Sequence, residues 1–148
     1  MSHAIADILT TSGITTLTTT VAALSLGAIE NGKPAAPLNA TSHIVWGDSA
    51  ANYSDFDLSH TLLGGVLNAG AMLSWAAVHR GLFPKPKSLF GALGSGVTVA
   101  AMAYVTDYYL VPKRFTPGFE KRVSGTALAT MYGVLAASLA VSAVLRRD

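Results

Sequence analysis

The sequence predicts an all-α integral membrane protein that folds as a four-helix bundle. Hydrophobic residues make up 51% of the 148-residue chain and charged residues only 12%, about half the charged share of a typical soluble domain. The mean hydropathy is +0.44. Four apolar stretches each approach or exceed the roughly 20 residues that a helix needs to cross a bilayer. This length suits a single transmembrane domain, residues 1–148.

The same composition argues against several other classes of protein. Cysteine is absent, which excludes disulfides, thiolate metal sites and a cysteine nucleophile. The formal net charge is only +2, and the basic residues are scattered in loops without a nucleic-acid-binding motif, so we expect no nucleic-acid partner. No nucleophile elbow, Walker loop or dinucleotide fingerprint is present. The sequence names no reaction and favours a non-enzymatic function.

The first predicted span, residues 8–29, is rich in threonine. A threonine in a lipid-embedded helix can donate its hydroxyl to the carbonyl one turn back, so we expect these residues at a helix–helix interface or a slight bend, not along a solute pathway. Residues 1–6 contain no lysine or arginine, whereas a signal peptide has a basic N-terminal region. We therefore expect a retained helix. The stretch Asn31-Gly32-Lys33-Pro34 predicts its end.

The second and third predicted spans cover residues 58–78 and 89–111. The segment Pro84-Lys85-Pro86-Lys87 separates them, and Pro112 ends the third. Asn68 lies near the middle of the second span, where its amide cannot remain unpaired in lipid. We expect an interhelical hydrogen bond from this amide, with a threonine of the first span as a suitable partner.

The fourth predicted span covers residues 124–145, and Thr116-Pro117 resembles an N-cap followed by proline at the first helical position. Small residues recur in this span at every fourth position, which allows close backbone approach between lipid-embedded helices. The partner helix belongs either to the same chain or to a second copy or larger complex. The stripe consists of Gly125, Ala129, Gly133 and Ala137.

Four antiparallel spans place the loops after the first and third spans on one side, and both termini with the short loop 79–88 on the other. Lysine and arginine do not decide the orientation, because five lie on each side. The absence of acids from the basic stretch 80–87 favours cytoplasmic termini. The two sets are Arg80, Lys85, Lys87, Arg146 and Arg147, and Lys33, Lys113, Arg114, Lys121 and Arg122.

The first loop contains the polar stretch "NATSHIVWGDSA", residues 39–50. It is acid-rich and the second loop is base-rich, so we expect the two to pair. Whether residues 36–57 re-enter the membrane or lie along its surface stays open. Aromatic residues near span ends are interpreted as interfacial anchors, as is His79 on the opposite side. These aromatic residues are Trp46, Trp75, Tyr104, Tyr108, Tyr109 and Phe119.

Polar residues that the topology brings to one side form the candidate ligand site. Asp57 and His60 are spaced to share a helix face, although Asp57 is equally suited to cap the helix. Asp107 lies about one turn inside the third span, where an ionisable group usually faces the bundle interior and has a partner. Lys113, Arg114 and His60 are the expected partners. The complete candidate site is His43, Trp46, Asp57, His60, Asn68, Asp107 and Arg114.

A metal site is a weaker alternative. His43, His60 and Asp107 offer donors for a borderline or hard metal ion, but their spacing matches no metal-binding motif. We predict no cofactor.

The stretches "PLNATSHIVWGDSA", "DLSHTLLGGVLNAGAMLSWA" and "VTDYYLVPKRFTPGFEKRVS" resemble a family of small, uncharacterised bacterial membrane proteins. The resemblance covers roughly residues 36–124. It implies four spans in the bacterial inner membrane and draws attention to the polar loops, and it implies no activity.

Three functions agree with these observations. The first is a membrane protein that binds or passes a small polar ligand, an ion or a proton. The second is a structural or accessory subunit that docks through its small-residue stripes. The third is a metal-dependent membrane enzyme.

Overall fold

The computed structural model describes residues 2–146, and within that range every regular element is helical. Arg147 and Asp148, at the predicted cytoplasmic terminus, lie outside the described residues, as does Met1. The long helices are α1 (Ser2–Asn31), α4 (Leu63–Leu82), α5 (Leu89–Val105) and α6 (Gly125–Leu145). A π-helical turn extends two of them, with η2 (Leu58–Leu62) before α4 and η3 (Thr106–Leu110) after α5.

Four helices are long and apolar enough to cross a membrane, as predicted, and they run from His3 to Asn31, Leu58 to Leu82, Leu89 to Leu110 and Gly125 to Leu145. The first begins earlier than predicted and the second ends later. Their outer surfaces carry large apolar side chains, such as that of Phe90, which is 86% exposed. The chain therefore has the form of a multi-pass membrane protein.

The prediction that Thr116-Pro117 starts the fourth helix was wrong. Gly118 adopts a positive φ of 81°, a left-handed conformation that interrupts a helix, and only a short turn, η5 (Phe119–Lys121), follows it. α6 starts at Gly125 because the hydroxyl of Ser124 accepts a hydrogen bond from the Ala127 N–H at 3.1 Å, as an N-cap does.

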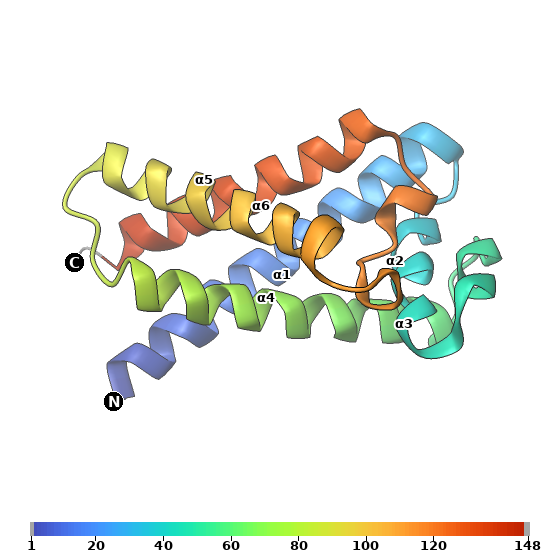
Figure 1. Ribbon diagram of the computed structural model, residues 1–148, viewed down its shortest axis with the longest axis horizontal. Coiled ribbons are helices and arrows are strands. Elements are labelled where there is room, and N and C mark those ends of the chain that lie inside the picture. The colour runs from blue at the N-terminus through green and yellow to red at the C-terminus, as the bar shows by residue number, and fades with distance from the viewer. Residues whose placement is uncertain (1, 147–148) are drawn as a thin grey trace.

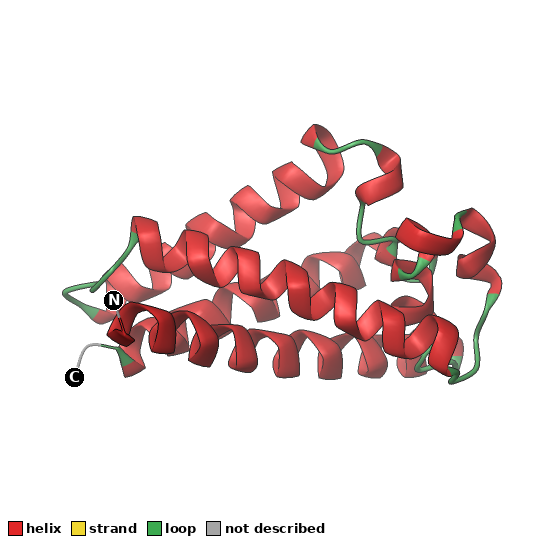
Figure 2. Ribbon diagram, turned by 90° about the horizontal axis from the view of Figure 1, so that it is seen from below, coloured by secondary structure: helices red, strands yellow, loops and turns green. Residues whose placement is uncertain are grey.

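The four long helices run antiparallel, and both termini lie at one end of the bundle (Figure 1). α1 packs against α4 and α6, and α5 packs against α6, whereas α4 and α5 touch each other less. Figure 2 shows α5 leaning away from the other long helices toward its C-terminal end. The loops after α1 and α5 meet at the end opposite the termini, as the topology predicts.

The predicted helix-interface position is confirmed for Thr11, Thr15 and Thr19 of α1. Thr15 and Thr19 donate their hydroxyls to the carbonyls of Thr11 and Thr15, at 2.9 and 2.7 Å. These three residues are buried, so the polar side chains lie in the helix interface with their donors satisfied.

Two glycines mark the closest backbone contacts. A Cβ on Gly96 of α5 would collide with the carbonyl oxygen of Ala136 in α6, and a Cβ on Gly64 of α4 would collide with that of Leu38. The predicted stripe on α6 is different, because all four of its residues are exposed and a Cβ on Gly133 would meet no atom within 4 Å. The closest helix contacts within the chain therefore involve Gly64 and Gly96 and not the residues of the stripe.

The first loop folds into three short helices, α2 (Ala36–Thr41), α3 (His43–Trp46) and η1 (Asp48–Asn52). All six residues of α2 are buried, and α2 packs against α1 and α4. It therefore closes the loop end of the bundle as an internal plug. The second loop adds η4 (Lys113–Phe115) and η5 beside it.

Candidate functional site

The seven predicted site residues separate into three groups. One group ties the two loops together, a second caps the start of η2 and α4, and the third lines a cavity between the long helices. Only Asn68 and Asp107 belong to the third group.

His43 belongs to the group that joins the loops. Its side chain is 1% exposed, and its Nε2 lies 2.8 Å from the carbonyl oxygen of Thr116. A carbonyl can only accept a hydrogen bond, so Nε2 carries the proton. The other ring nitrogen lies 3.7 Å from an Asp48 carboxylate oxygen and 3.5 Å from the Lys121 ammonium. The ring is thus committed to holding the loops together.

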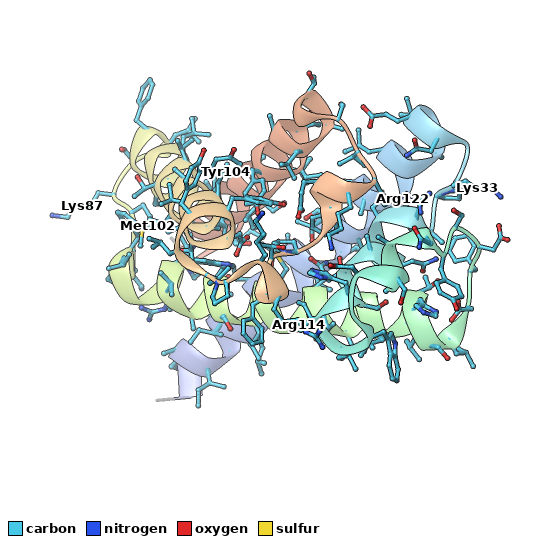
Figure 3. All side chains as sticks on the ribbon, turned by 45° about the vertical axis from the view of Figure 1, so that its right-hand side comes forward. Lys33, Lys87, Met102, Tyr104, Arg114 and Arg122 are labelled. Carbon is cyan, nitrogen blue, oxygen red and sulfur yellow. The ribbon has the colours of Figure 1, made fainter. Side chains whose placement is uncertain are left out.

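Charged side chains of the second loop continue this contact, as predicted for a base-rich loop beside an acid-rich one. Arg114 donates to the carbonyls of Ile44 and Val45 at 2.8 and 3.0 Å, and Arg122 donates to the carbonyl of Ala51 at 2.5 Å. Both arginines extend toward the first loop in Figure 3. Arg114 therefore caps the α3 end of the first loop and does not pair with Asp107.

Asp48 and Lys121 form the closest ion pair of this group, with 2.5 Å between the carboxylate and the ammonium. The hydrogen bond and the positive charge from Lys121 hold the pKa of the Asp48 carboxyl below its usual value. The carboxylate is largely exposed to solvent, so the ion pair adds little to stability. Its main effect is on how the two loops align.

Asp57 and His60 form the second group. The Asp57 carboxylate accepts from the backbone N–H of His60 at 2.8 Å and lies 2.9 Å from the His60 ring. Desolvation raises the pKa of Asp57, but the hydrogen bonds from His60 outweigh it and the pKa lies below its usual value. The ring of Tyr53 stacks on His60 with 3.8 Å between centroids. The capping interpretation of Asp57 is therefore confirmed.

Trp46 lies beside this second group at the surface. Its indole N–H donates to the carbonyl of Ser59 at 2.8 Å, and the residue is 53% exposed, as expected of an interfacial anchor. Two other predicted anchors lie inside the protein instead. Phe119 is 7% exposed and belongs to the core, and the half-buried Trp75 lines a cavity.

That cavity has a volume of about 100 Å³ and lies between α4, α5 and α6 under the two loops. It is large enough for several water molecules or a small organic molecule. Loop residues Thr41, Ile44, Phe115 and Pro117 contribute to its lining. The deeper lining includes Thr19, Leu67, Asn68, Ala71, Met72, Trp75, Ala103, Asp107, Met131, Tyr132 and Leu135.

Asn68 presents a free acceptor at this cavity. Its amide nitrogen donates to the hydroxyls of Thr19 and Thr20 at 3.0 and 3.2 Å, so the predicted bond to a threonine of the first span is confirmed. Thr19 gives its only hydroxyl proton to Thr15, so it must accept from Asn68. This fixes the orientation of the amide. The carbonyl oxygen accepts no hydrogen bond from residues 2–146, although Asn68 is 5% exposed.

Asp107 lies in the π-helical turn η3 on the cavity wall. One carboxylate oxygen accepts from the Tyr132 hydroxyl at 2.6 Å. Asp107 faces the interior and has a partner, as predicted, but the partner is a tyrosine. Within residues 2–146 no lysine, arginine or histidine forms an ion pair with Asp107, and its second oxygen accepts no hydrogen bond.

Three cavity residues were missed as members of the site. Thr19 was one of several similar threonines, Trp75 was assigned to the interface, and Tyr132 was overlooked. The position of Tyr132 offered a signal, because it places a phenol hydroxyl two turns inside a largely apolar span.

The metal prediction gains no support from the geometry. Among residues 2–146, no three histidine or carboxylate side chains group in a way that could hold a metal ion. His43, His60 and Asp107 each have separate surroundings, facing Thr116, Asp57 and Tyr132 respectively.

A second buried polar network lies at the termini end of the bundle. His79 was predicted to be interfacial, but it is fully buried. Arg146 donates to its Nδ1 at 3.2 Å, so its Nε2 carries the proton and donates to the Ser95 hydroxyl at 2.9 Å. Arg146 also donates to Thr11 at 3.0 Å. The network joins α1, α4, α5 and the end of α6.

No family model matches the chain, and comparisons with curated proteins and with solved structures found no match.

Proposed function

We propose that this protein binds a small polar ligand, or exchanges a proton, in the cavity between α4, α5 and α6, called the α4–α5 cavity below. One observation carries the proposal. Asn68 and Asp107 line the same apolar cavity and each keeps an acceptor oxygen that no group in residues 2–146 satisfies. Both oxygens keep accessible surface at the cavity, because the fully buried side-chain atom without a partner among residues 2–146 is Arg146 Nε. Two free acceptors on one cavity wall are therefore the feature expected of a binding site.

The surroundings of the cavity suit this role. Ligand sites are mostly apolar, with a few polar groups that fix orientation. Asp107 lies in a π-helical turn, a distortion found frequently at functional sites. Loop residues Ile44 and Phe115 contribute to the cavity lining together with Asp107, so the hydrogen-bonded loops border the cavity.

A fluorescence titration tests the proposal. The chain has two tryptophans, and the variant Trp46→Phe leaves only Trp75, on the cavity wall. We expect n-butylammonium or 1-butanol, added to this variant in phosphatidylcholine nanodiscs, to cause a saturable change in Trp75 emission. The proposal fails if neither solute does so.

Two substitutions on α4 provide matched variants. Both alanines are exposed on the same helix, but Ala71 lines the cavity and Ala77 does not. Ala71→Leu reduces the cavity volume and should weaken the saturable change about tenfold or more. Ala77→Leu should leave it unaltered. Equal effects of the two variants would show that the solutes act through the lipid.

We further propose that the chain belongs to the small four-span bacterial family that its loops resemble, and that it lies in the inner membrane with both termini in the cytoplasm. The basic loop between α4 and α5 supports this orientation, since Lys85 and Lys87 lie in it and the short loop contains no acid. Reporter fusions to each terminus test the orientation, and periplasmic activity of both would reverse it.

An accessory subunit is the second candidate function. The observation that favours it is the exposed α6 stripe, on which a Cβ at Gly133 would meet no atom within 4 Å. Membrane helices associate through such small-residue surfaces, so a second copy or another membrane protein has room to approach there. Blue-native electrophoresis distinguishes this candidate, which predicts a heavier assembly in the native membrane extract.

A further inference from the structure

We infer that the ligand of the α4–α5 cavity is a small organic ammonium ion, and this inference rests on the proposed binding function. The unsatisfied groups define the chemistry. The free atom of Asn68 is a carbonyl oxygen, because its nitrogen is committed to Thr19 and Thr20. The free atom of Asp107 is a carboxylate oxygen, because the other oxygen accepts from Tyr132. Both are acceptors, so the complementary ligand is a hydrogen-bond donor.

The charges around Asp107 favour a cation over a neutral hydrogen-bond donor as the ligand. No basic side chain of residues 2–146 is paired with Asp107. Arg114 is committed to backbone carbonyls of the first loop and Lys121 to Asp48. Lys113 is exposed and forms no ion pair with Asp107. A carboxylate on a weakly polar wall interacts with a cation more strongly than it would in water. A ligand ammonium would supply the counter-charge that the chain does not place there.

The walls select an organic cation. Trp75, Phe115 and Tyr132 line the cavity together with aliphatic side chains, and aromatic rings bind organic ammonium groups through their π-faces. A hard inorganic cation needs about six oxygen ligands, more than Asn68, Asp107 and the nearby hydroxyls supply. A volume of about 100 Å³ suits a small alkyl group beside the ammonium.

The test compares three solutes of nearly equal size that differ in their polar group, namely n-butylammonium, 1-butanol and butyrate. The Trp46→Phe protein is held in nanodiscs of zwitterionic phosphatidylcholine at neutral pH, and Trp75 emission reports occupancy. We expect n-butylammonium to bind at least about tenfold more tightly than 1-butanol, and butyrate not to bind. This comparison needs no further variant and does not depend on whether a substituted protein folds.

Variants then assign the preference to Asp107. Asp107→Asn keeps the side-chain size and an oxygen for Tyr132, and it should reduce the ammonium preference over 1-butanol to about twofold or less. Asp55→Asn is the control, because Asp55 is an exposed carboxylate paired with Lys33 at the loop surface, and the preference should persist.

The outcomes separate the two proposals. If 1-butanol binds as tightly as n-butylammonium, or butyrate binds as well, the ammonium inference is overturned while the binding cavity stands. Retention of the full preference by a folded Asp107→Asn protein overturns the assigned site of recognition. If no solute binds, the binding function itself fails.

Discussion

Asn68 shows how one residue combines a structural bond with a free acceptor. Replacing it with leucine removes the interhelical bonds to Thr19 and Thr20. Such bonds contribute about 0.6 kcal/mol on average, and at most about 1.7 kcal/mol, to membrane protein stability. We expect Asn68→Leu to lower the free energy of unfolding by about 1 kcal/mol, measured by unfolding in bicelles. Ser74→Ala, which removes an exposed hydroxyl bonded only within α4, is the control, and an equal loss there would contradict the assignment.

Asp48 makes the stability of the contact between the two loops depend on pH. Its pKa is lowered in the folded protein by Lys121, so the Asp48–Lys121 pair stabilises the joined loops at pH values above the usual carboxyl value of 3.8. That contribution is lost as the pH falls through the lower, folded-state value. Carboxyl carbon NMR on the Lys121→Met variant should show the pKa of Asp48 moving up toward 3.8. An unchanged pKa would show that Lys121 is not its cause.

At the scale of elements, the contact between α2 and α4 depends on one glycine. Gly64→Ala places a methyl group against the carbonyl of Leu38, and overpacking of this kind costs about 1–3 kcal/mol. Gly65→Ala is a matched control on the next residue, where a Cβ meets nothing within 4 Å. Thermal unfolding should show Gly64→Ala clearly destabilised and Gly65→Ala unchanged or stabilised. Equal behaviour of the two would contradict the buried position of α2.

The long helices and their ends were largely predictable because hydropathy and proline spacing are local signals. The structure of the loops was not, since α2 is buried by contacts with α1 and α4 that lie far from it in sequence. The site was predictable only in part, for the same reason. The bond from Asn68 to a threonine followed from the need to satisfy an amide in lipid. The pairing of Asp107 with Tyr132 depends on how α5 packs on α6, which no sequence spacing specifies.

At the scale of the whole molecule, a substitution in the exposed α6 stripe tests whether the protein self-associates. Gly133→Leu adds a side chain where the chain leaves open space, so we expect no loss of monomer stability but a shift from oligomer to monomer in chemical crosslinking. Gly13→Leu is the control, because Gly13 on α1 also has open space around it and lies off the stripe. An unchanged distribution in both variants would contradict an interface at the stripe.

The molecule as a whole places two polar networks at opposite ends of the bundle. The His79 network at the termini end joins all four long helices with its ring nitrogens both paired. The cavity end instead leaves the acceptors of Asn68 and Asp107 unpaired. The termini end also holds an unpaired buried atom, Arg146 Nε. Our proposed function assigns ligand binding to the loop end, where the unpaired acceptors line a cavity.

NMR of the full chain in nanodiscs tests ligand binding at the cavity most directly. Carbon-13 signals of the Asp107 carboxyl and the Asn68 side-chain amide would be followed during titration with n-butylammonium. We predict that both signals shift along saturable curves with the same dissociation constant, while the exposed Asp55 carboxyl stays unchanged. Shifts confined to Asp48 and Asp55 in the loops, or the absence of any saturable shift at Asn68 and Asp107, would contradict the proposed site.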